Sequence, residues 1–285
     1  MRKLIIGAAV IVGFASFAGF AGCAAKPEAP VLHNLTGAAL TQTNARLGAL
    51  LPTDVLLLGE QHDAPEHQQI QAEVIAVLAQ RGLLGAVALE MADAGATTAA
   101  LHPSSTELQA QSALKWNNKA WPWQAYGPAV MTAVRAGVPV IGANMPRQAM
   151  RAAMDNSKLD NQLPGPALKA QQQLIRIGHC NLLPENQIGL MTRIQIAKDI
   201  SMAATLSKAA LPGKVVVLVA GSGHIDKLLG VPQHLAASVG SKAVRLRAGE
   251  AAATDSADAF DAVWATPAVP DKDYCAEFKA QMMKQ

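Results

Sequence analysis

The chain has 285 residues, of which 51% are hydrophobic and 16% are charged. This apolar content is sufficient for a packed core and excludes wholesale disorder. The formal net charge is +3, from 24 basic and 21 acidic residues with no long run of either sign, so the chain lacks the concentrated basic surface of nucleic-acid binders. We therefore expect no nucleic-acid partner.

The N-terminal segment has the layout of a secretory signal. Arg2 and Lys3 precede an apolar run over 4–20, and small residues lead to Cys23. The sequence Phe-Ala-Gly-Cys at 20–23 resembles the lipobox of bacterial lipoproteins, in which the cysteine becomes the first residue and carries the lipid. The apolar run is at the short edge of a membrane span, which needs about 20 residues, so an uncleaved transmembrane anchor is the alternative.

The N-terminal pattern defines three predicted regions. We predict a signal peptide over 1–22, a lipidated N-terminus and tether over 23–50, and a single folded domain over 51–285. Ala24 follows the cysteine in place of an aspartate, which favours sorting to the outer membrane, with the protein facing the periplasm or the cell surface. The membrane is then a partner through the lipid, because several acyl chains together anchor a protein stably.

Strands and helices alternate along the rest of the chain. Short apolar runs predict strands that are buried on both faces, and longer runs with helical spacing predict the helices between them. Asp63 followed by Pro65 predicts a helix start with Asp63 as the N-cap. This alternation predicts an α/β fold with a mostly parallel sheet covered by helices on both faces. The predicted strands cover 55–58, 86–91, 138–143, 215–220, 243–246 and 261–264, and the predicted helices cover 64–81, 128–136, 166–177 and 185–207.

Ionisable side chains stand where the predicted strands end. Glu60 and His62 follow the first strand, Glu90 ends the second, and His224 follows the strand at 215–220. Because ligands of open parallel sheets bind outside the carboxyl ends of the strands, we expect these four residues to converge on one rim, with Arg147 close enough to pair with a carboxylate. They could ligate a divalent metal or form a metal-free acid–base group. Each histidine could equally be a satisfied turn residue.

Aromatic residues are scarce, and four of them lie within 116–126. Trp123 and Tyr126 are three residues apart and would share one face of a helix. The segment could be a satellite core beneath a long connection, or a flat platform for a planar ligand. In the second case a tyrosine oxygen could ligate haem iron, and Tyr126 is the first choice. The rival ligands are Tyr274, His33, His102 and His234.

Two cysteines remain if Cys23 carries lipid. They are Cys180 and Cys275, an even pair in an oxidising compartment, which favours a disulfide. The alternative is two buried free thiols, since unpaired cysteine is among the most buried residue types.

Six motifs occur in chain order, namely Gly59-Glu60-Gln61-His62-Asp63, Val87-Ala88-Leu89-Glu90-Met91, the segment 121–128, Ala143-Asn144-Met145-Pro146-Arg147, Gly178-His179-Cys180 and Ala220-Gly221-Ser222-Gly223-His224. Together they resemble the ChaN-type haem-binding lipoproteins, a branch of the Tiki/TraB and erythromycin-esterase-like superfamily. The resemblance implies an α/β fold, a role in iron or haem uptake, haem held through a tyrosine, and two haems facing each other between the subunits of a homodimer. Other branches use the Glu and His rim for hydrolysis, sometimes with a metal.

Two hypotheses of different classes follow from these observations. The first is a lipid-anchored haem-binding protein of bacterial iron or haem uptake, with Tyr126 as the iron ligand and Trp123 beside it. Haem is the expected cofactor, and a homodimer is the expected state on haem binding. The second is a hydrolase or metal-dependent enzyme, with a divalent metal as its possible cofactor. Its catalytic residues would be Glu60, His62, Glu90 and His224.

Overall fold

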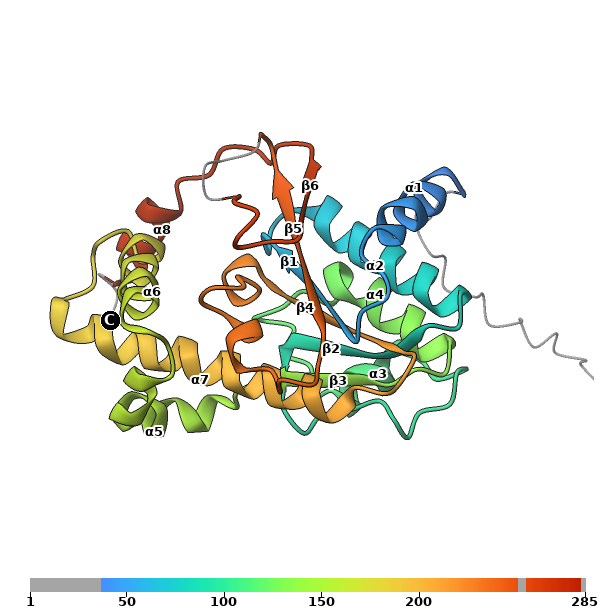
Figure 1. Cartoon of the computed structure of the whole chain (residues 1–285), viewed down its shortest axis with the longest axis horizontal. Helices are drawn as coiled ribbons and strands as arrows, with labels where there is room; N and C mark the ends of the chain where they lie inside the picture. Colours follow the sequence, from blue (N-terminus) through green and yellow to red (C-terminus); the bar gives the residue numbers. More distant parts are fainter. Residues whose placement is uncertain (1–36, 251–254, 283–285) are drawn as a thin grey trace, which may run out of the picture. The chain divides into compact units, whose positions relative to one another are not determined.

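The computed structural model of the protein describes residues 37–250 and 255–282, all of which belong to one compact unit. The predicted signal peptide, Cys23 and the predicted tether as far as residue 36 lie outside the described residues. Six strands form one sheet in the order β3-β2-β4-β1-β5-β6, and each pair of neighbours is parallel (Figure 1). The strands are β1 (Val55–Glu60), β2 (Leu84–Asp93), β3 (Val140–Asn144), β4 (Val215–Gly221), β5 (Ser241–Ala248) and β6 (Ala262–Thr266).

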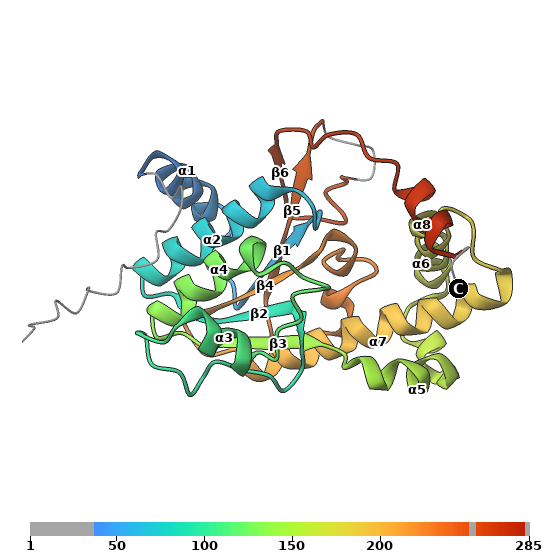
Figure 2. The same ribbon diagram turned by 180° about the vertical axis from the view of Figure 1, so that it is seen from behind.

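Helices cover both faces of this sheet, which confirms the predicted α/β fold (Figures 1 and 2). The helices on one face are α1 (Gly37–Gly48), α2 (Pro65–Gln80), α3 (Glu107–Ala113) and α4 (Trp123–Arg135), and α7 (Glu185–Ala209) crosses the other.

Alternate residues of the central strands supply the two cores. Leu56 and Leu58 pack in the core with α2 and α4, whereas Val55 and Leu57 pack in the core with α7. All four side chains are fully buried. A parallel strand shielded on both faces needs apolar residues at every position, which is why β1 and β4 are continuous apolar runs.

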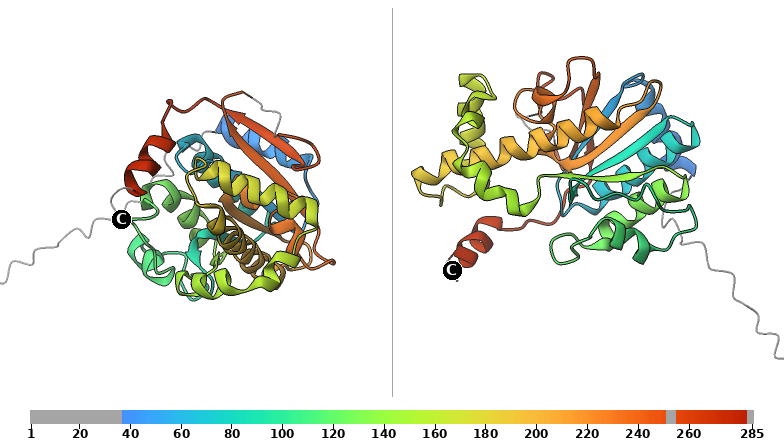
Figure 3. Two further views of the ribbon diagram at one scale, coloured as in Figure 1. Left: turned by 90° about the vertical axis from the view of Figure 1, so that its left-hand side faces the viewer. Right: turned by 90° about the horizontal axis from the view of Figure 1, so that it is seen from below.

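A helical extension lies beyond the carboxyl end of β3 (Figure 3). It consists of α5 (Met150–Asp155), α6 (Gly165–Gly178) and the first half of α7, and it has a small apolar core of its own. The Arg193 guanidinium on α7 binds both carboxylate oxygens of Asp160 and the carbonyl oxygen of Met154, which fixes the extension to α7. Short 3₁₀ helices complete the described chain at Arg147–Ala149, Ser157–Asn161, Ser222–His224 and Val231–His234.

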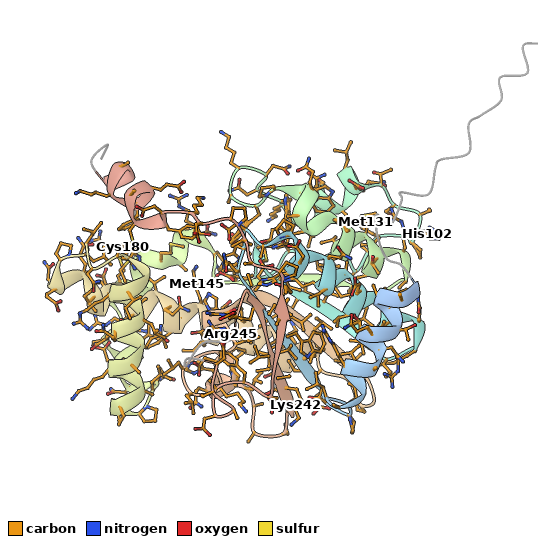
Figure 4. All side chains as sticks on the ribbon, turned by 90° about the horizontal axis from the view of Figure 1, so that it is seen from above. His102, Met131, Met145, Cys180, Lys242 and Arg245 are labelled. Carbon is orange, nitrogen blue, oxygen red and sulfur yellow. A yellow bond between two sulfur atoms is a disulfide. The ribbon has the colours of Figure 1, made fainter. Side chains whose placement is uncertain are left out.

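The described chain closes with α8 (Tyr274–Met282), which is joined to the extension by a disulfide. Cys180, in the turn after α6, is bonded to Cys275 in α8, and their Cα atoms are 5.5 Å apart (Figure 4 labels Cys180). None of the helices in the described ranges is long and apolar enough to cross a bilayer.

Two helix starts and the start of the folded domain differ from the prediction. Ala64, not Asp63, is the N-cap of α2, because the Asp63 carboxylate accepts hydrogen bonds from side chains outside the helix. Helix α4 begins at Trp123 rather than Pro128, since the aromatic side chains of its first turns are buried in the core. Part of the predicted tether folds as α1, where Leu47 is fully buried, so the folded domain begins before residue 51.

Candidate functional site

The Glu60 carboxylate, at the end of β1, is the centre of a buried hydrogen-bond network. Its Oε1 accepts from the Tyr126 hydroxyl at 2.6 Å and lies 2.7 Å from Nδ1 of His62. Its Oε2 accepts from the side-chain amides of Gln68 and Gln71 on α2, at 2.9 and 2.7 Å. A carboxylate can remain inside the protein only with such donors, because an unpaired buried charge is very costly.

The Glu90 carboxylate, at the end of β2, is the centre of a second network. Its Oε1 lies 3.2 Å from Nε2 of His224, and its Oε2 accepts from the backbone N–H of Gly221 at 2.8 Å. On its other side, the His224 ring meets the carboxylate of Asp199 on α7 through Nδ1. His62 connects the two networks, since its Nε2 is 4.0 Å from Glu90 Oε2 while its Nδ1 contacts Glu60.

His224 is an imidazolium held between two carboxylates. Burial alone would lower its pKa, but the charges of Glu90 and Asp199 outweigh that effect and raise the pKa to about 10. Burial would likewise raise the pKa of Glu90, yet the charge and hydrogen bond of His224 lower it well below the usual range. Burial raises the pKa of Asp199 to about 6, so at neutral pH the positive His224 lies between two negative groups.

His62 is the member of these networks that reaches solvent, with 41% of its side chain exposed. Burial lowers its pKa, but the hydrogen bond to Glu60 and the charge of Glu90 produce a net increase. Trp121 covers the ring edge-on, with 4.9 Å between centroids. A side chain at Gly221 would begin 3.0 Å from Nε2 of His62, so any larger residue there would require this ring to shift.

The structure therefore brings the four predicted rim residues together, but Arg147 does not join them. Its side chain is exposed, and among the described residues it makes no ion pair. Within the same ranges, no three His, Cys, Asp or Glu side chains are placed to hold a metal ion. What the arrangement offers chemically is a partly exposed imidazole with a carboxylate behind it, which is the geometry of an oriented general base.

Sequence patterns alone left out three residues of the networks. Gln68 and Gln71 lie one turn apart on α2, so they face Glu60 together. Asp199 is three residues from both Ile196 and Met202, which are fully buried. A carboxylate on the apolar stripe of a long helix indicates a buried partner, and this signal could have identified Asp199.

The aromatic segment is a satellite core. The Tyr126 side chain is only 2% exposed, and burial together with Glu60 raises the pKa of its phenol. Trp123 is 6% exposed, packs on Trp116, and donates its indole N–H to Glu107 at 2.7 Å. Neither side chain is accessible to a ligand as large as porphyrin, so the geometry argues against the expected roles of Tyr126 and Trp123.

The other candidate tyrosine, Tyr274, lies at the surface beside the same loop. It is 46% exposed, and its hydroxyl donates to the Asp63 carboxylate at 2.5 Å. This hydrogen bond raises the pKa of the Tyr274 phenol. The Gln61 side-chain amide donates to the Tyr274 hydroxyl oxygen at 3.3 Å. The loop at 60–63 therefore has two sets of contacts. Glu60 and His62 belong to the buried networks, whereas Gln61 and Asp63 contact Tyr274.

The family of the chain is established by its sequence. The model of the family described as haem-binding uptake, Tiki superfamily, ChaN matches residues 47–235, and the chain belongs to this family. No curated protein matches the chain.

Comparison with solved structures agrees with this assignment. The chain is similar to the ChaN protein of Campylobacter jejuni, solved with cofacial haem, at 26% identity and a TM-score of 0.62, over 77% of this chain and 89% of that one. It is more distantly similar to the type III effector HopBA1, at 15% identity and a TM-score of 0.42, over 76% of this chain and 88% of that one. A Bacillus cereus protein has 13% identity and a TM-score of 0.41, over 74% of this chain and 70% of that one.

The charge of His224 predicts a specific pH dependence of stability. Its pKa is raised from 6.5 to about 10 by folding, so its contribution is complete below about pH 6.5 and is lost as the pH rises toward 10. We expect the free energy of unfolding of the wild-type protein, measured in urea, to fall across this range. The His224→Gln variant should be less stable at pH 7 and should lack this decline. A parallel decline in both proteins would contradict the assignment of charge to His224.

Proposed function

We propose that this protein binds haem and that Tyr274 provides the iron ligand. The observation that carries the proposal is the exposed Tyr274 phenol, held by Asp63 and Gln61 in a chain of the haem-binding ChaN family. A phenolate is a ligand used by some haem proteins. The C. jejuni relative, solved with cofacial haem, supports haem as the ligand class.

The segment to which α8 is disulfide-bonded carries exposed apolar side chains. Leu174 and Ile177 are exposed one turn apart on α6, and Leu182 is exposed in the turn that follows. The disulfide joins this turn to α8, which carries Tyr274. Exposed apolar groups of this kind mark a ligand site or an interface, so the same surface supports the proposal of a homodimer on haem binding.

The residues around the phenol have distinct roles in this proposal. Before haem binds, Asp63 and Gln61 hold the hydroxyl oxygen in one position, and Lys272 places its ammonium 5.1 Å from the centroid of the tyrosine ring. Ligation as a phenolate would end the hydrogen bond to Asp63, because the phenolate has no proton to donate. Bound haem would supply a ferric centre for which a hard anionic oxygen is a suitable donor. The protein contributes the ligand, its orientation and an apolar surface.

The setting of the protein is also a proposal. We infer from the lipobox-like Cys23 that the chain is an outer-membrane lipoprotein that faces the periplasm or the cell surface and acts in iron or haem uptake. A lipid anchor would keep a haem-binding domain beside the membrane that haem must cross.

A second candidate function is hydrolysis at the buried networks. The observation in its favour is His62, whose Nδ1 is fixed by Glu60 while the ring stays 41% exposed. In this role His62 would be the general base that takes a proton from water, and Glu60 would orient it. The ion pair of Glu90 and His224 would keep the electrostatic environment of His62 constant.

The Tyr274→Phe variant tests haem ligation, because it keeps the ring and removes only the oxygen. In a haemin titration followed by absorption, we expect the affinity of this variant for haemin to fall by more than about a hundredfold. Such a loss exceeds the effect of removing a residue that only supports a metal ligand. Tyr126→Phe is the matched control and should retain the affinity and ferric spectrum of the parent. Equal spectra and affinities for Tyr274→Phe and wild type would contradict the ligand assignment. Sedimentation of the haemin-loaded protein tests the dimer.

The Glu60→Gln variant separates the second function from the first. It removes the negative charge behind His62, so hydrolysis of an activated ester such as p-nitrophenyl acetate should fall to the rate without protein. Haemin affinity should remain unchanged, since Glu60 does not contact Tyr274. Ester hydrolysis that survives the substitution would contradict a role for this carboxylate.

The Cys23→Ser variant tests the anchor. Only a thiol can accept the diacylglycerol, so we expect the variant to leave the outer-membrane fraction and to lose incorporation of labelled palmitate. A variant that remains in the membrane fraction would instead support an uncleaved transmembrane segment.

A further inference from the structure

Helix α8 has little packing of its own. Over 274–280, every side chain is exposed except Phe278, and none belongs to the three apolar cores. The helix is nine residues long. Isolated helices shorter than about 12 residues are marginal in water, so contacts with the rest of the protein must hold α8 in place.

Three contacts join α8 to distant segments in the part of the chain that the structure describes. The Cys180–Cys275 disulfide is covalent. The Phe278 ring packs edge-on against His179, with 5.5 Å between centroids. The third contact is made by the Tyr274 hydroxyl itself on residues 60–63. The segment 267–273, which leads into α8, contains neither helix nor strand.

At its other end, the disulfide is attached to the hydrogen-bonded turn after α6. The turn after α6 is closed by a hydrogen bond from the Asn181 N–H to the Arg176 carbonyl oxygen. The Arg176 guanidinium makes two hydrogen bonds to the Glu185 carboxylate at the start of α7. Cys180 lies in this turn with a φ of 57°, in the left-handed region. The bond therefore holds Cys275, the direct neighbour of Tyr274, on an ordered part of the extension.

We propose that the Cys180–Cys275 disulfide is the positioning element of the Tyr274 ligand, so that haem affinity depends on the thiol state of this pair. The inference rests on the proposed function of Tyr274. The disulfide acts on α8 and not on the cores, because no residue of α8 contributes to them. Without the bond, the contacts described above that join α8 to distant parts of the chain are one ring contact and the hydrogen bonds of the ligand itself.

Reduction by a dithiol follows a balanced exchange. The dithiol supplies two electrons and two protons, the bond between the two cysteine sulfurs breaks, two cysteine thiols form, and the reductant becomes a cyclic disulfide. Tyr274 is unchanged chemically. Only the fraction of molecules that hold its phenol beside residues 60–63 falls, and apparent affinity falls in proportion to that fraction.

The first experiment compares the full chain in oxidised, reduced and Cys180→Ser/Cys275→Ser forms. We expect haemin affinity to fall by about tenfold or more in the last two forms. This is the fall expected if Tyr274 is correctly positioned in about a tenth of the molecules. Amide exchange should quicken over 274–280 and remain unchanged in β1 and β4. Reoxidation should restore affinity in the wild type and not in the double variant. Unchanged affinity, or equal acceleration of exchange in β1 and β4, would overturn the proposal.

Two controls separate this inference from the proposed function. His179→Ala removes the ring contact on Phe278 but keeps the disulfide, so it should change haemin affinity far less than the double variant. If oxidised wild type binds no haemin, or Tyr274→Phe binds as wild type does, the proposed ligand is wrong. In that case faster exchange of α8 on reduction still supports the positioning role of the bond, and unchanged exchange overturns it.

Discussion

Buried negative charge at the carboxyl ends of the central strands is the constraint on which the site depends. Glu60, Glu90 and Asp199 are all inside the protein, where an unpaired carboxylate would be strongly destabilising. The fold meets this demand with donors from several elements, which include amides of α2, a phenol of α4, a backbone N–H of β4 and the imidazolium of His224. Each donor fixes one element against another at the same end of the sheet.

This demand explains why Tyr126 is a poor candidate for a ligand and a good structural residue. Its hydroxyl is one of the donors that Glu60 needs, so binding a metal through that oxygen would leave the carboxylate short of a partner. Tyr274 is in the opposite position, because its own acceptor, Asp63, is exposed and can be satisfied by water. The exposed phenol is free to exchange partners in a way that the buried phenol is not.

Sequence patterns predicted most of the fold because its signals are local. The apolar runs of β1 and β4, bounded by glycine and polar residues, mark buried parallel strands without any knowledge of their neighbours. The convergence of Glu60, His62, Glu90 and His224 also followed, since each lies just after or at the end of a strand. The roles of Tyr126 and Tyr274 could not be predicted in this way. They depend on which side chain reaches Glu60 and which reaches Asp63, and those contacts span 66 and 211 residues.

The placement of the disulfide after the sheet has a consequence for biosynthesis. Cys275 follows β6, so a growing chain cannot form the bond with Cys180 until the last strand of the sheet has been made. The two cysteines are 95 positions apart, and the closed loop between them contains α7 and three strands. A chain that stops before Cys275 could fold much of its core and still lack the disulfide-linked helix α8. The disulfide thus marks chains whose synthesis has passed β6.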